Sequence, residues 1–173
     1  MKRAAQVKKN TLRSKKHLLR CYRPRCVRVL FVGEAPPASG RFFYQEDSGL
    51  YRAIRQAFVE AFPVLRERDF LESFRALHCY LIDLCKNPVD RLSSRQRLRA
   101  RRDGEARLGN RFRQLRPEII VTVVRGIAEN VERSQGLANW SGLHIKLPYP
   151  GRWHHHRKTF VQTLIPTLRR ECG

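Results

Sequence analysis

Residues 27–33 read VRVLFVG, a short apolar run that ends in glycine. The length of this run and its three valines predict a buried strand rather than a helix. The following residues, 33–47, read GEAPPASGRFFYQED, and their Gly, Pro and small side chains predict a loop. We therefore expect a buried strand whose carboxyl end opens directly into a long loop.

The rest of the chain alternates strand-like apolar runs with helical patterns. Further strands are predicted at 78–85, 118–124 and 143–148. Helices are predicted over 48–62, from Ser93 or Ser94 with a break near Gly104 or Gly109, over 127–133 and over 157–169. This alternation predicts an α/β fold with a mainly parallel sheet that is covered on both faces. Ligands of such sheets bind beyond the carboxyl ends of the strands, which here are followed by residues 33–47, 83–91, 125–127 and 149–158.

The composition indicates a globular domain with a large excess of positive charge. Lys and Arg number 36 and Asp and Glu 15 in 173 residues, which gives a net charge of +21. The apolar fraction of 42% is too high for a disordered chain. Because no apolar run approaches the roughly 18 residues of a membrane span, a membrane-spanning protein is excluded. The charge predicts a polyanionic partner, either nucleic acid or an anionic membrane surface.

The N-terminal segment and the cysteines suggest where the protein works. Residues 1–26 are basic and lack acidic side chains, which predicts a flexible arm that contacts phosphates, ahead of a single domain over 27–173. The five cysteines form no CxxC motif, so we expect a reducing compartment, no metal and no cofactor. If the source is bacterial, the pattern predicts a cytoplasmic, nucleoid-associated protein. Organelle or nuclear targeting by the basic N-terminus stays open.

The first loop places a carboxylate, a cation and aromatic rings together. Gly33 lets the backbone approach a ligand, and Glu34 puts a carboxylate at the edge of the sheet. Arg41, Phe42 and Phe43 follow in the same loop. An aromatic face near a carboxylate suits a pocket for a planar base. The alternative is a solvated loop whose Phe side chains fill the core.

The last loop, LPYPGRWHHHRK over 147–158, is stiffened by two prolines. Its cations can hold phosphates, and Trp153 can insert between stacked bases. A metal site on the three consecutive His is disfavoured, because adjacent residues rarely all face one ion. The candidates for DNA contact in the two loops are Arg41, Arg152, Trp153, His154, His155, Arg157 and Lys158. Ten more arginines between Arg91 and Arg116 are expected mainly to raise general affinity.

Four segments together resemble the uracil-DNA glycosylase superfamily. They are VRVLFVGEAPPASGRFFY, HCYLIDLCKNP, RPEIIVTVV and LPYPGRWHHHRKTFVQTLIPTLRR, in that order over 27–170. The first is similar to the strand and GExP-type turn of that superfamily, and the last to its LPHPS-type terminal motif. The resemblance implies a three-layer α/β/α domain with a four-stranded parallel sheet. It also implies hydrolysis of the bond between a damaged base and deoxyribose, after the nucleotide is flipped out of DNA.

The resemblance assigns roles to individual residues of the first loop. Glu34 falls where several families carry the polar residue that positions or activates water. Phe43, or its neighbour Phe42, falls at the aromatic that stacks on the flipped base. Gly33 and Ala35 lend backbone groups to the pocket. The expected partner is therefore DNA, bound by a monomer, with no membrane partner.

Two residues depart from the family pattern. Asp83 stands in place of the Asn that reads the uracil edge, and a neutral Asp83 with a pKa raised by burial can also both donate and accept a hydrogen bond. Tyr149 stands in place of the terminal His and can donate a hydrogen bond but carry no positive charge. Cys21 and Cys26 lie too close to the first strand, and Asn87 stands where a further ligand is expected, so no iron–sulfur cluster is predicted.

Three functions are compatible with these patterns. The leading hypothesis is a base-excision DNA glycosylase that uses Glu34 and Tyr149 as catalytic residues. The alternative is a non-catalytic nucleic-acid-binding protein on the same fold, which the residues at positions 83 and 149 favour. A nucleotide or small-molecule hydrolase of another α/β family is the third, although the sequence contains no Walker A or GxGxxG motif for phosphates.

Overall fold

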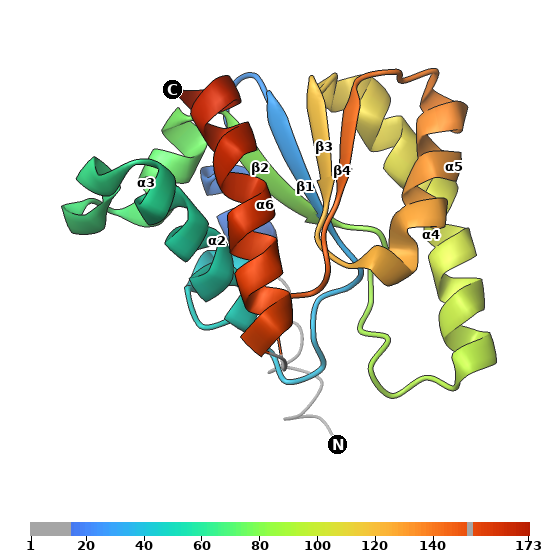
Figure 1. The fold of residues 1–173 in the computed structure, drawn as a ribbon. Helices are drawn as coiled ribbons and strands as arrows, with labels where there is room; N and C mark the ends of the chain where they lie inside the picture. Colours follow the sequence, from blue (N-terminus) through green and yellow to red (C-terminus); the bar gives the residue numbers. More distant parts are fainter. Residues whose placement is uncertain (1–14, 152–153) are drawn as a thin grey trace.

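The computed structural model describes residues 15–151 and 154–173 and contains one parallel four-stranded sheet (Figure 1). The strands are β1 (Val29–Gly33), β2 (Cys79–Asp83), β3 (Ile119–Thr122) and β4 (Leu143–Lys146). Their order across the sheet is β2-β1-β3-β4, and every neighbouring pair is parallel. All residues of β1 and β3 are buried, as their unbroken apolar sequences predict. The predicted α/β class is confirmed.

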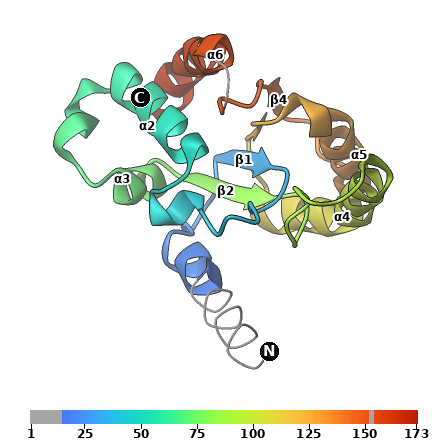
Figure 2. The ribbon, with the colours of Figure 1, turned by 90° about the horizontal axis from the view of Figure 1, so that it is seen from below.

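Helices cover both faces of the sheet and complete three layers. The helices are α2 (Gly49–Ala61), α3 (Phe70–Ala76), α4 (Ser94–Leu115), α5 (Ala128–Ala138) and α6 (His154–Cys172). Short 3-10 turns are η1 (Phe43–Gln45), η2 (Pro63–Glu67) and η3 (Arg125–Ile127). Figures 1 and 2 show α2, α3 and α6 on one face and α4 and α5 on the other. Among residues 15–151 and 154–173, no helix is long and apolar enough to cross a membrane.

The strand order creates a switch point between β1 and β3. The chain leaves β1 toward β2 on one side, and later enters β3 on the other side of β1. Connections that diverge in this way open a crevice at the carboxyl ends of the two strands, where ligands of open α/β sheets bind. Figure 2 views the molecule from this side. The fold therefore directs attention to the residues that follow Gly33 and Thr122.

Helix α4 is continuous, contrary to the predicted break. Ser93 caps it, with its hydroxyl accepting from the Gln96 N–H and the Gln96 side chain accepting from the Ser93 N–H. The two glycines within it are buried contact points: a Cβ at Gly104 would collide with the Leu84 carbonyl, and one at Gly109 would lie 3.0 Å from the Ser134 carbonyl. These glycines allow close helix packing instead of ending the helix.

Other differences concern the ends of the chain and one missed helix. Helix α3 was not predicted, and α5 and α6 are longer than expected. Residues 15–21 are helical, and Leu18 and Leu19 pack against the core. Tyr22 stacks on Tyr44 with ring centroids 5.6 Å apart. The described part of the expected flexible arm is thus packed on the domain, while residues 1–14 lie outside the described residues.

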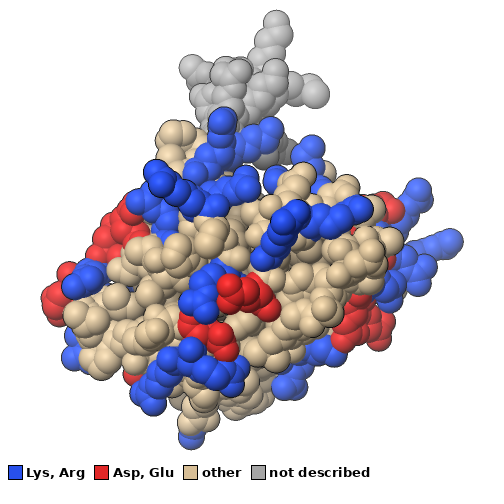
Figure 3. Space-filling model, turned by 90° about the horizontal axis from the view of Figure 1, so that it is seen from above, with Lys and Arg blue, Asp and Glu red and all other residues tan. Residues whose placement is uncertain are grey.

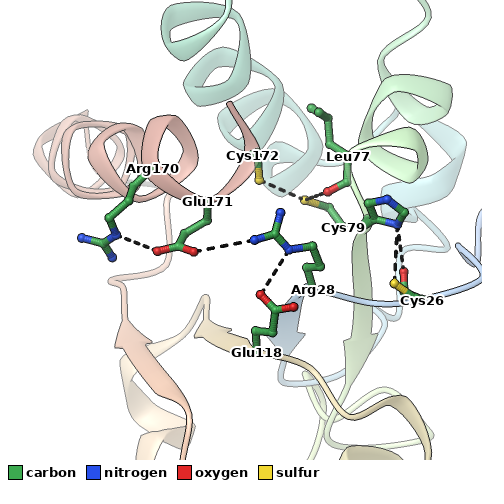
Figure 4. Close-up of polar contacts among 9 residues, drawn as sticks. Cys26, Arg28, Leu77, Cys79, Glu118, Arg170, Glu171 and Cys172 are labelled. Atoms are coloured by element: carbon green, nitrogen blue, oxygen red, sulfur yellow. Dashed lines mark hydrogen bonds and ion pairs between the residues drawn. The ribbon is translucent and has the colours of Figure 1, made fainter.

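The amino edge of the sheet balances its charges locally (Figures 3 and 4). Arg28 Nε lies 3.1 Å from Glu118 and its Nη2 4.0 Å from Glu171, which also accepts from Arg170 Nε at 2.6 Å. Nearby, the Cys79 and Cys172 sulfurs are 4.0 Å apart as free thiols (Figure 4). Acidic and basic side chains lie side by side on this face in Figure 3.

Candidate functional site

The loops after β1 and β2 are joined where the strands end. Leu84 N–H donates to the Gly33 carbonyl at 2.9 Å, and Cys85 N–H to the Glu34 carbonyl at 2.7 Å. These bonds continue the strand pairing by two residues and fix the position of Glu34 just beyond the carboxyl end of β1. The Cys85 thiol beside them has its pKa raised to about 11 by burial and by the Glu34 charge. It therefore stays protonated and is a poor nucleophile at neutral pH.

Asp83 and Gly33 face each other across the ends of β2 and β1. They are register partners, and a Cβ at position 33 would collide with Asp83 Oδ1. Glycine at this position thus makes room for the carboxyl group. Burial raises the pKa of Asp83 from its ordinary 3.8 to about 7, a rise that the charges of Arg107 and Lys15 oppose and that of Glu34 supports. Near neutral pH, Asp83 is therefore present both as carboxylic acid and as carboxylate.

Glu34 forms a buried ion pair with two arginines of α4. Arg97 donates from Nε to Oε1 at 2.6 Å and from Nη2 to Oε2, which is a bidentate contact. Arg101 donates from Nε to Oε1 at 2.7 Å. The Glu34 side chain is 9% exposed. Burial opposes its ionisation, but hydrogen bonds from Arg97 and Arg101 outweigh burial and lower the pKa of Glu34.

This arrangement limits what Glu34 can do. Both of its oxygens accept hydrogen bonds from guanidinium groups, and its lowered pKa makes it a weak base. The three side chains together carry one excess positive charge. In this state Glu34 is a fixed anion that orients two cations, and the expected activation of water would require it to release at least one of them.

Helix α4 ties the site together through a third arginine. Arg101 also donates from Nη1 to the Gly126 carbonyl at 2.9 Å, in the turn after β3. Arg107 donates from Nη2 to the Asp83 carbonyl at 2.9 Å and to the Leu84 carbonyl. One helix therefore contacts the carboxyl ends of β1, β2 and β3. We expected only the terminal loop to lie beside Glu34, whereas the structure also places Arg97 and Arg101 of the arginine-rich segment there.

A sequence signal for these arginines exists in the helical period. The buried side of α4 includes Gly104, Leu108 and Phe112, spaced by four residues. Extending that stripe toward the N-terminus by three and then four residues gives Arg101 and Arg97. Polar residues that continue an apolar stripe point at whatever lies beyond the core, which here is the carboxyl edge. Charge alone hid this pattern among the neighbouring exposed arginines.

The two aromatic candidates for base stacking lie in the core. Phe43 is 3% exposed and packs against Tyr44, Tyr51 and Phe74 with centroid distances of 5.0, 5.8 and 5.3 Å. Phe42 is 6% exposed and packs against Tyr44 at 5.6 Å. The structure therefore corresponds to the core-filling alternative. Stacking either ring on a flipped base would require the first loop to rearrange. The other two candidates of this loop are more accessible: Ala35 is half-buried and Arg41 is exposed.

Tyr149 lies in the terminal loop and is 47% exposed. Its ring lies over Gly151, where a Cβ would collide with it. Burial of the hydroxyl and the charge of Asp90 raise the pKa of Tyr149, against the charge of Arg52. Its hydroxyl is thus a neutral hydrogen-bond donor at physiological pH.

The remaining candidates of the terminal loop are only partly described. Arg152 and Trp153 lie outside the described residues. His154, His155 and Lys158 are exposed in the first turns of α6. Arg157 is half-buried and donates from Nε to Gln56 Oε1 of α2 at 2.9 Å. The structure therefore brings Arg157 to α2 rather than to Glu34.

Within residues 15–151 and 154–173, no three His, Cys, Asp or Glu side chains converge as metal ligands would. The site thus consists of the Gly33–Asp83 contact, the Glu34–Arg97–Arg101 ion pair and the neighbouring loops. No protein-family model matches the chain, and no curated protein matches it.

Proposed function

We propose that this protein is a DNA glycosylase that removes uracil or another deaminated base from DNA. The observation that carries the proposal is the carboxyl group of Asp83, which lies against Gly33 at the carboxyl edge and has a pKa of about 7. A neutral carboxylic acid presents one O–H donor and one carbonyl acceptor side by side. Uracil presents the complementary pair, the O4 acceptor and the N3–H donor. Asp83 in its acid form thus offers the hydrogen bonds of the Asn that it replaces.

The neighbouring groups fit the chemistry of base release. When the bond between C1′ and the base nitrogen breaks, the bonding electrons leave with the base; water then gives its hydroxyl to C1′ and its proton to the base anion. Arg97 and Arg101 carry one positive charge more than Glu34 neutralises. Such an excess stabilises the negative charge that develops on the departing base. The arginine pair therefore takes over the charge stabilisation that Tyr149, as a neutral phenol, lacks.

The basic surface fits the substrate. The net charge of +21 favours a polyanion, and the exposed Arg91, Arg95, Arg99 and Arg102 lie in and just before the first half of α4, next to Arg97 and Arg101. In Figure 1 this half of α4 extends beyond the carboxyl ends of the strands. DNA held there would place a flipped nucleotide beyond the carboxyl ends of β1 and β3, where ligands of open α/β sheets bind.

A second function, non-catalytic binding of nucleic acid, is favoured by a different observation. Both oxygens of Glu34 are occupied, and Phe42 and Phe43 are buried in the core. A protein that only binds DNA needs neither a free carboxylate nor an exposed stacking ring. The two functions differ in turnover and not in affinity.

The deciding experiment is a lesion panel. Oligonucleotides carrying uracil, hypoxanthine, xanthine or mismatched thymine, single-stranded and duplex, are incubated with the wild type, Glu34→Gln and Glu118→Gln, and free base and abasic sites are measured. We expect release of at least one base by the wild type and by Glu118→Gln, which alters an exposed ion pair at the amino edge, and strong loss in Glu34→Gln. Tight, salt-sensitive binding without release of any base would reject the enzyme and leave the binding protein.

A further inference from the structure

A groove of about 470 Å³ between α2, η2 and α6 collects positive charge away from the Glu34 site. Its charged lining residues are Arg52, Arg55, Arg66, Arg157 and Glu60. Four cations therefore face a single anion. Figures 1 and 2 show α2 and α6 side by side along this part of the surface.

The arginines of this groove are held by neutral groups. Arg157 Nε donates to Gln56 Oε1 at 2.9 Å, and Arg55 Nη2 donates to the Arg66 carbonyl at 3.1 Å. Glu60 Oε1 instead accepts from the Gln56 amide at 2.8 Å. In the part of the chain that the structure describes, the groove arginines form no ion pair, in contrast to Arg28 and Arg170 at the amino edge. Their mutual repulsion is relieved only by solvent ions or by a bound anion.

One end of the groove lies near Tyr149 of the terminal loop. Arg52 is close enough to Tyr149 for its charge to lower the pKa of that phenol. Arg157 follows the terminal loop within the first turn of α6. A strand whose target nucleotide lies near the Tyr149 loop would therefore reach the groove with its neighbouring phosphates.

We propose that this groove binds the phosphodiester backbone of a nucleic-acid strand on one side of the target nucleotide. Guanidinium groups match the oxygens of a phosphodiester with paired N–H donors, and several of them in one groove match its regular spacing of charge. The inference rests on the proposed function, because that function supplies the strand. It adds the side on which the strand leaves the site and the residues that hold it there.

The test removes two groove charges without touching the Glu34 site. Arg52 and Arg66 are exposed and donate no side-chain hydrogen bond in the described residues, so Arg52→Gln/Arg66→Gln should fold normally. The control, Arg25→Gln/Arg113→Gln, removes two exposed charges near the starts of β1 and β3. Affinity for an oligonucleotide is measured as a function of salt. Losing two phosphate contacts should make the log–log slope shallower by about 1.4 on single strands or about 1.8 on duplex.

We expect the shallower salt slope in Arg52→Gln/Arg66→Gln and an unchanged slope in the control, Arg25→Gln/Arg113→Gln. Equal slopes in the two variants would overturn the inference, because the charges would then act without a specific site. Polyglutamate bound as tightly as DNA, with the same dependence on Arg52 and Arg66, would overturn the assignment to nucleic acid.

A scan with single methylphosphonates locates the contact. Each oligonucleotide has one neutral linkage at a different distance from the target nucleotide. We expect a neutral linkage on one side of the target nucleotide, and not on the other, to weaken binding by the wild type. The same linkage should not weaken binding by Arg52→Gln/Arg66→Gln. Equal loss of affinity at every linkage would overturn the inference. A groove-dependent slope without base release would reject the glycosylase and keep the groove. Base release with equal slopes in both variants would reject only the groove.

Discussion

Replacing Asp83 with asparagine should remove a large pH dependence from the stability of this protein. Burial raises the pKa of the Asp83 carboxyl to about 7 in the folded protein, from an ordinary value of 3.8. The unfolded chain therefore releases this proton at a lower pH than the folded chain does. Between these two pKa values the wild type loses stability as pH rises, and the loss is complete above the folded-state value. Asparagine is neutral throughout and shows no such loss.

The size of the effect follows from the two pKa values. A difference of one between folded and unfolded pKa corresponds to about 1.4 kcal/mol, so the full loss is roughly 4 kcal/mol. Part of it already occurs below about pH 5, where the unfolded carboxyl titrates, and roughly 2–3 kcal/mol remains between about pH 5 and pH 8. The stability of Asp83→Asn relative to the wild type should rise by that amount over this interval.

Urea denaturation of both proteins at the two pH values measures this difference. Asp103→Asn, at an exposed position of α4, is the control, and its stability relative to the wild type should not change between the two pH values. The same carboxyl should govern activity: base release by the wild type should fall as pH rises through about 7, and Asp83→Asn should abolish that fall. If the difference in stability between Asp83→Asn and the wild type is the same at both pH values, Asp83 is not neutral in the folded protein. The proposed hydrogen bonds from Asp83 to the base would then be refuted as well.

Four other substitutions test how the site and the core that supports it are built. Glu34→Gln should lower the free energy of unfolding by roughly 2–4 kcal/mol, because it leaves two guanidinium groups without their anion, and an unchanged urea midpoint would contradict the buried ion pair. Gly104→Ala should destabilise the protein by at least about 2 kcal/mol, because its Cβ would collide with the Leu84 carbonyl. Gly136→Ala in α5, where the new Cβ meets open space, should instead stabilise it by about 0.5–1 kcal/mol. Equal melting temperatures of the two variants would contradict the contact at Gly104. Phe43→Ala should cost roughly 3–5 kcal/mol of stability as a core truncation, and a loss of DNA affinity without loss of stability would show that the ring stacks on a base instead.

The sequence predicted the sheet because its signals are local. Unbroken apolar runs such as 27–33 occur where a strand is buried on both faces, and β1 and β3 are buried along their whole length. The glycines of α4 were misread for the opposite reason. Their meaning depends on the Leu84 and Ser134 carbonyls, which lie on other elements. A contact between distant segments leaves no trace in a local pattern.

The same distinction explains the site. Glu34 and Asp83 were found because each directly follows or ends an apolar run, which is a local signal. Arg97 and Arg101 were missed because their neighbours in sequence are equally basic, and only the packing of α4 selects which ones turn inward. Phe43 illustrates the third case, in which residue type allowed either a stacking ring or a core residue and tertiary packing decided for the core.

The two carboxyl groups at this edge acquire opposite properties from their surroundings. Glu34 lies between two guanidinium groups, which lower its pKa and fix it as an anion. Asp83, one strand away, has no such partner among the described hydrogen bonds, and burial raises its pKa toward neutrality. The negative charge of Glu34 contributes to that rise. Because Arg97 and Arg101 keep Glu34 ionised, they indirectly keep Asp83 available as a hydrogen-bond donor. Carboxyls whose pKa values are driven apart in this way take different roles in a site, one as a fixed charge and the other as a titrating group that meets the ligand. If the charge of Glu34 separates the two pKa values, the residual base release by Glu34→Gln should decline at a lower pH than that of the wild type, whereas Glu118→Gln at the amino edge should leave that pH unchanged.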